Sequence, residues 1–245
     1  MKRWITGIVW LLGVAMLPGQ NLVPNPGFEQ FESCPKSYTS RAPGTLVPGW
    51  EMPSRGTPDY YHSCSRFNVG VPMNMMGNCF PAEGKAYAGM ILLENPGKME
   101  EGKRPLDYRE YLRCALEEPL EAGKKYRVGC AFAVAGHSMY LAPRLGLHLS
   151  DEPVKKRKGV IGVEPNVLMD STRFDYEQET WYSLSDTITA RGGEKHLLIG
   201  NFFDDRHTPY RERRLSDYPG YRKRSIEEIA VAYLFIDEVE VRLIE

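Results

Sequence analysis

Residues 21–29, with the sequence NLVPNPGFE, and residues 235–241, with the sequence FIDEVEV, decide the fold of this chain. Both segments predict a β-strand with a carboxylate at its polar edge, Glu29 in the first and Asp237 in the second. Two terminal strands that carry matching acidic residues can pair and share one cation, because carboxylate oxygens are hard ligands. The two segments therefore predict a β-sandwich whose chain ends meet, and they favour a single-domain binding module.

A targeting signal is expected over residues 1–20. Lys2 and Arg3 form a positive start, residues 4–17 are mostly apolar, and Pro18-Gly19-Gln20 forms a small-residue exit. The apolar stretch is shorter than the ~20 residues that a spanning helix needs, and no second stretch follows it. We expect an exported protein of the periplasm, outer cell surface or extracellular space, with no transmembrane segment after cleavage. A retained N-terminal anchor is the alternative.

The mature chain, residues 21–245, has the length of one all-β domain. Loss of Lys2 and Arg3 changes the formal charge from −1 to −3, with 29 basic against 32 acidic residues. The chain thus has no overall positive field to attract nucleic acid or anionic lipid. The 18 prolines and 23 glycines of the full 245-residue sequence fit many short strands joined by defined loops.

Seven segments have the alternating or continuous apolar pattern of strands, with turn residues between them. They are residues 86–93, 108–116, 126–134, 144–150, 181–190, 196–203 and 233–243. This number and length of strands predicts an all-β fold with two packed antiparallel sheets, a jelly roll.

Three segments interrupt the pattern. Residues 151–170 contain four consecutive basic residues and predict an exposed loop with one extra strand, and residues 225–230 predict a short helical turn. Residues 204–229 predict a loop insertion in which arginines alternate with tyrosines, Tyr210 among them. Such side chains can stack on sugars or bases and pair with anionic groups. The simpler interpretation is a solvated insertion that covers a sheet edge.

Five cysteines in an exported chain favour disulfides with one thiol left over. Cys34 and Cys64 lie in loop-like segments, where a bridge would restrict the unfolded chain, so we expect a Cys34–Cys64 bond. Cys114 and Cys130 lie in expected strands. They could face each other in a hairpin, or they could both be small core residues in opposite sheets. The pairing of Cys79, Cys114 and Cys130 stays open.

Several motifs in order along the chain resemble galactose-binding-like jelly rolls of the carbohydrate-binding-module type. Residues 21–29 resemble their opening, residues 119–128 (PLEAGKKYRV) their central turn and strand, and residues 181–202 their late strands. Residues 236–239 (IDEV) resemble their closing strand, with Glu238 in place of a second aspartate. The resemblance is nearest to a subgroup in exported envelope proteins of Gram-negative, Bacteroidetes-type bacteria. Such modules often precede an OmpA-type domain, which is not recognised here.

This resemblance implies a structural calcium ion between the first and last strands. The ligands would be the backbone carbonyl of Gly27 and the carboxylates of Glu29 and Asp237, with Asp59 as a further candidate. Calcium takes six to eight oxygens at about 2.3–2.6 Å, so other carbonyls and waters must complete the shell. The alternative is that Glu29 and Asp237 pair with arginines or cap turns. A bound ion would stabilise the folded state and perform no chemistry.

The motifs are structural, and catalytic patterns are weak. Gly136-His137-Ser138-Met139 lacks the turn that presents a nucleophile. Asp204 and Asp205 are adjacent, so on an extended chain they point to opposite faces. Glycoside hydrolysis needs two carboxyls roughly 5–9.5 Å apart across a sugar. We therefore expect a non-catalytic protein, and a glycoside hydrolase, the less favoured alternative, would need a cleft with two converging carboxylates.

Two kinds of partner fit this prediction. The first is a glycan, with Trp50, Tyr60, Tyr61 and Tyr210 as candidates for stacking on sugar rings, although Trp50 follows Pro48-Gly49 and could equally be core. The second is an envelope protein that docks on the sandwich. Exposed coplanar aromatic rings would favour a sugar, whereas an apolar patch of several hundred Å² would favour a protein.

Overall fold

The structure, a computed structural model, describes residues 19–38, 44–96, 107–213 and 229–244. Most of the expected targeting signal and residues 225–228 of the expected helical turn therefore lie outside the described residues. In the described part of the chain, no helix has the length and apolar character needed to cross a bilayer.

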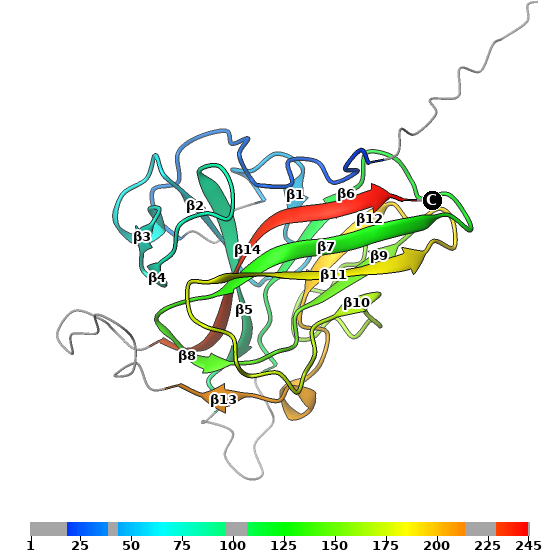
Figure 1. The fold of residues 1–245 in the computed structure, drawn as a ribbon. Coiled ribbons are helices and arrows are strands. Elements are labelled where there is room, and N and C mark those ends of the chain that lie inside the picture. The colour runs from blue at the N-terminus through cyan, green and yellow to red at the C-terminus, as the bar shows by residue number, and fades with distance from the viewer. Residues whose placement is uncertain (1–18, 39–43, 97–106, 214–228, 245) are drawn as a thin grey trace, which may run out of the picture.

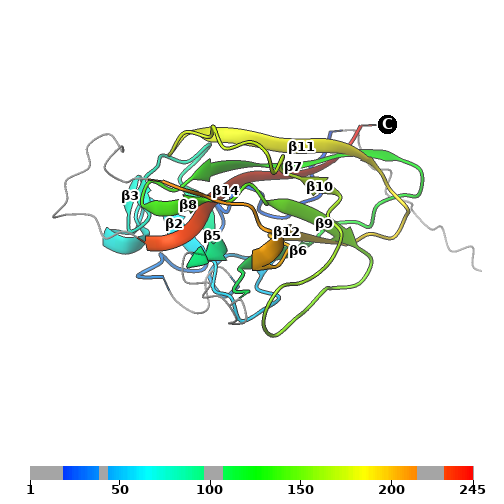
Figure 2. The ribbon, with the colours of Figure 1, turned by 90° about the horizontal axis from the view of Figure 1, so that it is seen from below.

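Two sheets pack face to face, and Figure 2 shows the layers edge-on, with β11, β7 and β14 in one and β9, β12 and β6 in the other. The five-stranded sheet has the order β1 (Trp50–Glu51), β6 (Tyr111–Ala115), β12 (His196–Gly200), β9 (Gly146–Ser150) and β10 (Val167–Leu168). All of its pairs are antiparallel.

The second sheet has seven strands (Figure 1). Its main path is β11 (Trp181–Thr189), β7 (Lys125–Val134), β14 (Ile229–Leu243), β5 (Ala86–Glu94) and β2 (Asp59–His62). β8 (Ser138–Leu141) pairs in parallel with β14, and β13 (Arg211–Glu212) pairs with β8. A small ribbon joins β3 (Met73–Asn74) to β4 (Gly77–Asn78), and among the described residues Phe67–Val69 and Asp205–His207 form 3₁₀ helices. The expected all-β jelly roll is confirmed.

The main core lies between the two sheets, and the period-two pattern of β7 shows how the sequence builds it. Tyr126, Val128, Cys130 and Phe132 all point into this core and are at most 3 % exposed. Apolar side chains of β12 and β9 meet them from the opposite sheet.

The outer face of the seven-stranded sheet is also covered. Tyr61, Tyr87, Tyr233 and Phe235 form a second apolar cluster there, beneath side chains of residues 69–79. Because β5 and β14 are buried on both faces, their sequences read as nearly continuous apolar runs.

The chain ends meet as expected, but the first segment is not a strand. Asn21 forms one isolated bridge with Arg242, and the Leu22 N–H donates to the Val241 carbonyl at 2.8 Å. Residues 23–28 then form turns, with positive φ at Asn25 (49°) and Phe28 (60°). Two prolines in this stretch lack the N–H that a strand would donate, so a ladder cannot continue.

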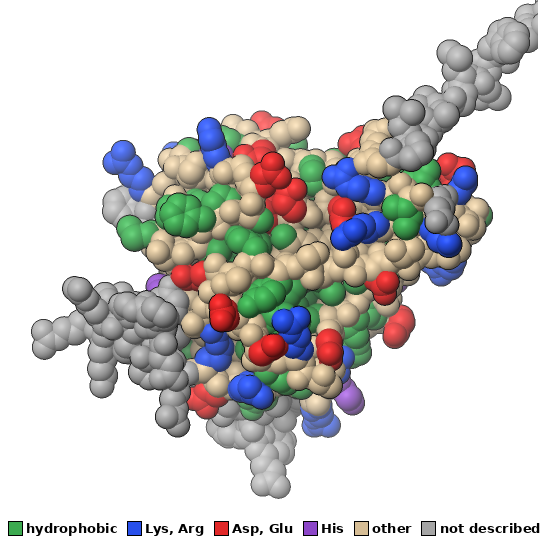
Figure 3. All heavy atoms as spheres, in the orientation of Figure 1, with side chains coloured by type: hydrophobic (Ala, Val, Ile, Leu, Met, Phe, Trp, Pro, Cys, Tyr) green, Lys and Arg blue, Asp and Glu red, His purple; other side chains and the backbone are tan. Residues whose placement is uncertain are grey.

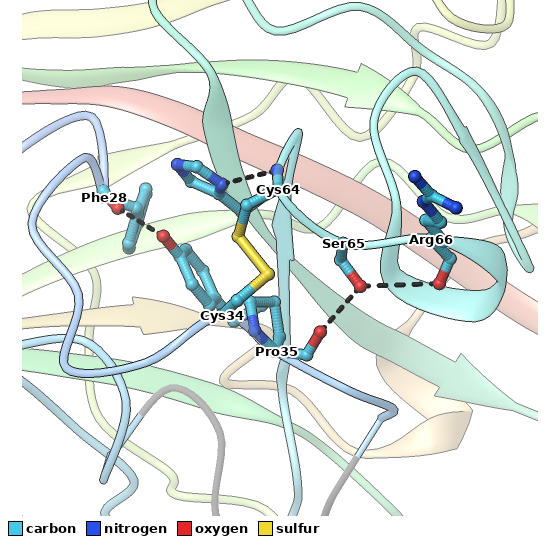
Figure 4. The surroundings of a disulfide bond; sticks show 8 residues. Phe28, Cys34, Pro35, Cys64, Ser65 and Arg66 are labelled. Carbon is cyan, nitrogen blue, oxygen red and sulfur yellow. Dashed lines mark hydrogen bonds between the residues drawn. A yellow bond between two sulfur atoms is a disulfide. The ribbon is translucent and has the colours of Figure 1, made fainter.

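The Cys34–Cys64 disulfide is confirmed, with Cα atoms 6.0 Å apart (Figure 4). It joins the loop after Phe28 to the end of β2, where Ser65 Oγ also donates to the Pro35 carbonyl at 2.6 Å. The other three cysteines are free and buried: Cys114 and Cys130 belong to opposite sheets and pack in the main core, and Cys79 lies in the outer cluster.

The structure agrees in part with the predictions for residues 151–170 and 225–230. The basic loop contains the short extra strand β10. Ile229 and Ala230, expected in a helical turn, instead begin β14. They are neighbours of β8 and β5, and this pairing outweighs their weak local preference for a helix. Figure 3 shows acidic and basic side chains interspersed over the described part of one face.

Candidate functional site

The terminal segments bring three acidic side chains around Gly27. A first side-chain carbon placed on Gly27 would lie 2.8 Å from Glu238 Oε1, 3.5 Å from Asp237 Oδ1 and 3.8 Å from Glu29 Cγ. The three side chains thus lie close around Gly27, and a larger residue there would displace the Glu238 carboxylate. We call this place the terminal carboxylate site.

Glu29 and Asp237 also hold the turn that precedes β5. Glu29 Oε1 accepts hydrogen bonds from the N–H groups of Lys85 (2.8 Å) and Ala86 (3.0 Å), and Asp237 Oδ2 accepts one from Ala82 (3.0 Å). The turn-capping part of the alternative interpretation is therefore present. Among the described residues, neither carboxylate forms an ion pair with an arginine.

Burial at this site disfavours the charged forms of two carboxyls. Asp237 is fully buried, and burial raises its pKa to about 8. The pKa of Glu238 is raised by burial and then by the charge of Glu83, with Arg242 acting in the opposite direction. Unpaired buried carboxylates are unfavourable, and a divalent ion would neutralise them.

The side chains alone do not form a metal cage. In the described ranges, no three His, Cys, Asp or Glu side chains are arranged to hold an ion. Backbone carbonyls and water would have to complete any shell at Gly27, Glu29 and Asp237. Asp59 is not among the groups around Gly27, because it binds Tyr233 and Tyr61 elsewhere on the sheet.

The predicted aromatic residues do not form one exposed surface. Trp50 and Tyr60 lie in the main core and Tyr61 in the outer cluster, each at most 2 % exposed. Trp50 Nε1 donates to the Asn25 carbonyl at 3.0 Å, which fixes its ring inside the fold. These three rings cannot stack on a sugar, and this corrects the expectation. Tyr210 is 40 % exposed.

The acidic pair Asp204 and Asp205 is structural in this fold. Asp205 Oδ1 accepts from Arg109 Nη1 at 2.8 Å, and both side chains of this ion pair are buried. Asp204 caps the 3₁₀ helix by accepting from the His207 N–H at 2.9 Å. The two carboxyls have separate partners and do not converge.

A pocket of about 190 Å³ lies on the outer face of the seven-stranded sheet. Asp59 of β2, Ile91 of β5 and Tyr233 of β14 contribute to its walls, together with Tyr108 and Glu110 just before β6. Met75 and Met76 extend its apolar side. We call this the outer-face pocket.

Tyrosine hydroxyls hold Asp59 in the outer-face pocket. Tyr233 Oη donates to Asp59 Oδ2 at 2.6 Å, and Tyr61 Oη lies 2.9 Å from Tyr233 Oη. Gly89 of β5 leaves room for this arrangement, since a first side-chain carbon there would lie 2.3 Å from Tyr233 Oη. Tyr233 can therefore lie across β5 and reach β2.

Glu110 is engaged on both carboxyl oxygens. Its Oε2 accepts from the Ile91 N–H at 2.8 Å, and its Oε1 accepts from Tyr108 Oη at 2.8 Å and from the Thr57 N–H at 3.2 Å. The backbone N–H of Glu110 donates back to the Ile91 carbonyl at 3.1 Å. Glu110 thus fastens the segment before β6 to the edge of β5.

The two carboxyls of the pocket influence each other. Burial raises the pKa of Asp59 to about 6 and that of Glu110 to about 8, and the charge of Asp59 adds to the rise at Glu110. A glycoside hydrolase would need two converging carboxylates in one cleft. Here Glu110 is 2 % exposed with both oxygens engaged, so it is placed to fix the wall and not to protonate a substrate.

Sequence reasoning missed the roles of Tyr108, Glu110 and Tyr233. One signal was available: in the alternating segment 108–116, Glu110 shares a face with Leu112 and Cys114. A carboxylate on an otherwise apolar strand face predicts a buried polar contact, because a buried charge needs partners.

A second hollow of about 220 Å³ adjoins Tyr108 and is basic. Arg55, Arg157 and Lys158 line it and are exposed. Backbone hydrogen bonding from the Arg55 N–H to the Arg157 carbonyl at 3.2 Å joins the two loops that carry these side chains.

Comparison with known proteins gives distant similarities of fold. No family model matches the sequence. No curated protein matches it either. Among solved structures, the CBM22-1 xylan-binding domain of Xyn10C from Paenibacillus barcinonensis is similar at 12 % identity, 94 % coverage of this chain, 99 % of that one and a TM-score of 0.44.

Two further solved structures are similar at comparable distance. The K1 cleaved adhesin domain of Lys-gingipain from Porphyromonas gingivalis W83 has 12 % identity, with coverage of 88 % and 95 % and a TM-score of 0.39. A CBM4 structure has 8 % identity, with coverage of 90 % and 99 % and a TM-score of 0.35. At these scores the likenesses carry no inference about function.

Proposed function

We propose that this protein is a non-catalytic, exported binding module for glycan, and that sugar binds in the outer-face pocket. One observation carries this proposal: the lining of the pocket combines hydrogen-bond acceptors and tyrosine hydroxyls with apolar side chains. Asp59 and Tyr108 are among the polar lining residues, and Met75 and Ile91 are among the apolar ones.

This combination suits a pyranose ring, which has hydroxyl donors at its edge and apolar C–H groups on its faces. Carboxylates accept hydroxyl hydrogen bonds strongly because the acceptor is charged. The volume of about 190 Å³ lies below the roughly 300–1,000 Å³ of sites for drug-sized ligands. We therefore propose that the pocket takes one sugar residue, at a chain end or a branch.

We also propose a structural calcium ion at the terminal carboxylate site, held by the Gly27 carbonyl and by Glu29 and Asp237. The proposal is supported by the three acidic side chains that converge on Gly27 and by the burial of Asp237 without a basic partner among the described residues. The ion would join the first segment to the last strand and perform no step of a reaction.

An exported location agrees with the Cys34–Cys64 bond, because disulfides persist in oxidising compartments. Docking of an envelope protein is the second candidate function. It is favoured by two large apolar side chains near the β3–β4 ribbon, Met73 at 72 % and Phe80 at 69 % exposure.

The test is thermal unfolding of the mature protein with calcium, with chelator, and with a panel of envelope and plant polysaccharides. Preferential binding to the folded state raises the melting temperature. We expect a rise with calcium that Asp237→Ala removes, and a further rise with at least one polysaccharide. The absence of any rise with calcium contradicts the cation site.

Two tyrosine variants locate the glycan site. Tyr108→Phe removes a hydroxyl from the outer-face pocket, and Tyr210→Phe removes one from an exposed side chain of the insertion. We expect the first to weaken the polysaccharide-dependent rise and the second to leave it unchanged. The reverse result would move the site to the insertion, and no response to any polysaccharide would favour protein docking.

A further inference from the structure

We infer that the outer-face pocket selects an amino sugar with a free ammonium group. This inference rests on the proposed glycan-binding function and names the class of sugar. It is drawn from the charge, the open hydrogen-bonding capacity and the aromatic walls of the pocket.

The charge of the pocket wall has one sign. Asp59, Glu94 and Glu110 all line it, and none of the described wall residues is Lys, Arg or His. Three strands and one adjoining segment supply carboxyls or hydroxyls to the cavity: β2 gives Asp59, β5 gives Glu94, β14 gives Tyr233, and the segment before β6 gives Tyr108 and Glu110. A bound ammonium group would compensate the charge of these carboxyls in their ionised forms, which a neutral sugar does not do.

One carboxylate oxygen of Asp59 is available to accept a hydrogen bond from a ligand. The residue is 9 % exposed and lies in the pocket wall. Its Oδ2 accepts from Tyr233 and Tyr61, whereas its Oδ1 accepts no hydrogen bond from the described residues. An ammonium group has three donors in a compact cation, and one of them would complete the bonding of Oδ1.

The aromatic walls favour a cation for a separate reason. Tyr38, Tyr108 and Tyr233 all contribute to the pocket. The faces of aromatic rings carry partial negative charge, and sites that combine several rings recognise ammonium groups. Aromatic rings also contact the apolar faces of sugar rings. The same tyrosines could therefore contact both the ammonium group and the ring face of an amino sugar.

Electrostatic linkage supports the same ligand. With no cation present, two buried carboxyls that repel each other retain a proton near neutral pH, as the raised pKa values of Asp59 and Glu110 indicate. A bound ammonium would favour the ionised forms and lower both pKa values. Binding of a sugar that already carries an ammonium group should therefore release protons from these carboxyls, which calorimetry detects as a dependence of the heat on the buffer.

The experiment compares three β-1,4-linked oligosaccharides of equal length that differ only at carbon 2. The glucose oligomer carries a hydroxyl there, the N-acetylglucosamine oligomer an acetamido group, and the glucosamine oligomer an ammonium. At pH 6.5 we expect the glucosamine oligomer to bind at least tenfold more tightly than the other two. Binding of its ammonium form, unlike binding of the other two oligomers, should release protons from the pocket carboxyls.

Two variants test the charge. Asp59→Asn keeps the shape and removes the charge, and it should abolish the tenfold preference while the melting temperature shows that the protein is folded. Asp186→Asn is the matched control, because Asp186 is an exposed carboxylate on β11, at the opposite edge of the sheet from β2. It should leave the preference unchanged.

Each contrary result has a defined meaning. Equal binding of the three oligomers overturns the ammonium inference and leaves the glycan proposal standing. If no oligomer binds, the ammonium inference falls and the polysaccharide panel decides the glycan proposal. A lysine-containing peptide that binds through Asp59 when the glucosamine oligomer does not would overturn the inference in favour of a protein ligand.

Discussion

Three buried carboxyl groups couple protonation to folding in this protein. Asp237, Asp59 and Glu110 are each at most 9 % exposed, and none of them has a basic partner among the described residues. Each is instead held by N–H or hydroxyl donors. Burial without a counter-charge favours the protonated acid, so each group connects protonation to folding.

The pH dependence of stability follows from these groups in chelator. The folded-state pKa of Asp237, about 8, lies above its ordinary value of 3.8. Between these values the folded chain binds more protons than the unfolded chain, so the free energy of unfolding falls as pH rises. A single group contributes a slope of at most about 1.4 kcal/mol per pH unit. Asp59 and Glu110 act in the same direction, up to pKa values of about 6 and 8.

Urea unfolding at pH 5, 6, 7 and 8 in chelator checks this dependence. Asp237→Asn should flatten the slope by up to about 1.4 kcal/mol per pH unit and leave the part due to Asp59 and Glu110. Saturating calcium should also reduce the contribution of Asp237, because an ion binds its charged form. Equal slopes for the natural protein and the variant would contradict a raised pKa at Asp237.

The Cys34–Cys64 disulfide holds the loop between the first segment and β2. Cys34 and Cys64 are separated by 30 positions, and a closed loop of this length restricts the unfolded chain by about 3–4 kcal/mol. We expect Cys34→Ser with Cys64→Ser to lower the free energy of unfolding by that amount in urea titrations. Reductant should destabilise the natural protein and have no effect on the double variant. Equal stability of the two proteins would show that this bond does not hold the loop.

The elements that sequence reasoning predicted are those whose pattern is local. Residues 126–134 and 144–150 alternate, residues 196–203 contain a continuous apolar run, and the three segments correspond to β7, β9 and β12. The opening segment was predicted wrongly as a strand, because its glutamate and apolar residues suggested one while its prolines exclude a ladder. In β14, a bulge between Asp237 and Glu240 also lay beyond any sequence pattern.

The candidate sites depend on pairing across long sequence distances, which a single sequence does not specify. Gly27 and Asp237 could be matched because both belong to recognised motifs at the chain ends. The outer-face pocket joins Asp59, Glu110 and Tyr233 from three separate elements, and their approach depends on strand order. The aromatic residues were misplaced for the same reason, since alternation alone does not tell which face of a strand another layer will cover.

In the whole molecule, β14 connects the two candidate sites. Tyr233, Phe235 and Asp237 alternate along its outer face, so the outer-face pocket and the terminal carboxylate site lie four residues apart on one strand. At about 3.3 Å per residue, that separation is roughly 13 Å. β14 pairs with β7 on one side and with β5 on the other. Both sites therefore lie on a strand that is hydrogen-bonded along both of its edges.

A cation that joins the chain ends should therefore change local opening more than the global fold. The first segment is attached to β14 by few backbone bonds, such as Leu22 N–H to the Val241 carbonyl and Val239 N–H to the Pro26 carbonyl. Segments with few such bonds open most easily and exchange their amide hydrogens first. We expect chelator to speed exchange in peptides that cover residues 21–29 and 236–243.

Peptides from β7 and β12 provide the control for this measurement, because their strands are paired on both sides within the sheets. Their exchange should be the same with calcium and with chelator. Glu29→Gln should make the first segment exchange rapidly in both conditions, because it weakens both the cation site and the bonds to Lys85 and Ala86. Uniform acceleration across all peptides would mean that the ion acts on the whole fold. No change in residues 21–29 would mean that no ion joins the chain ends.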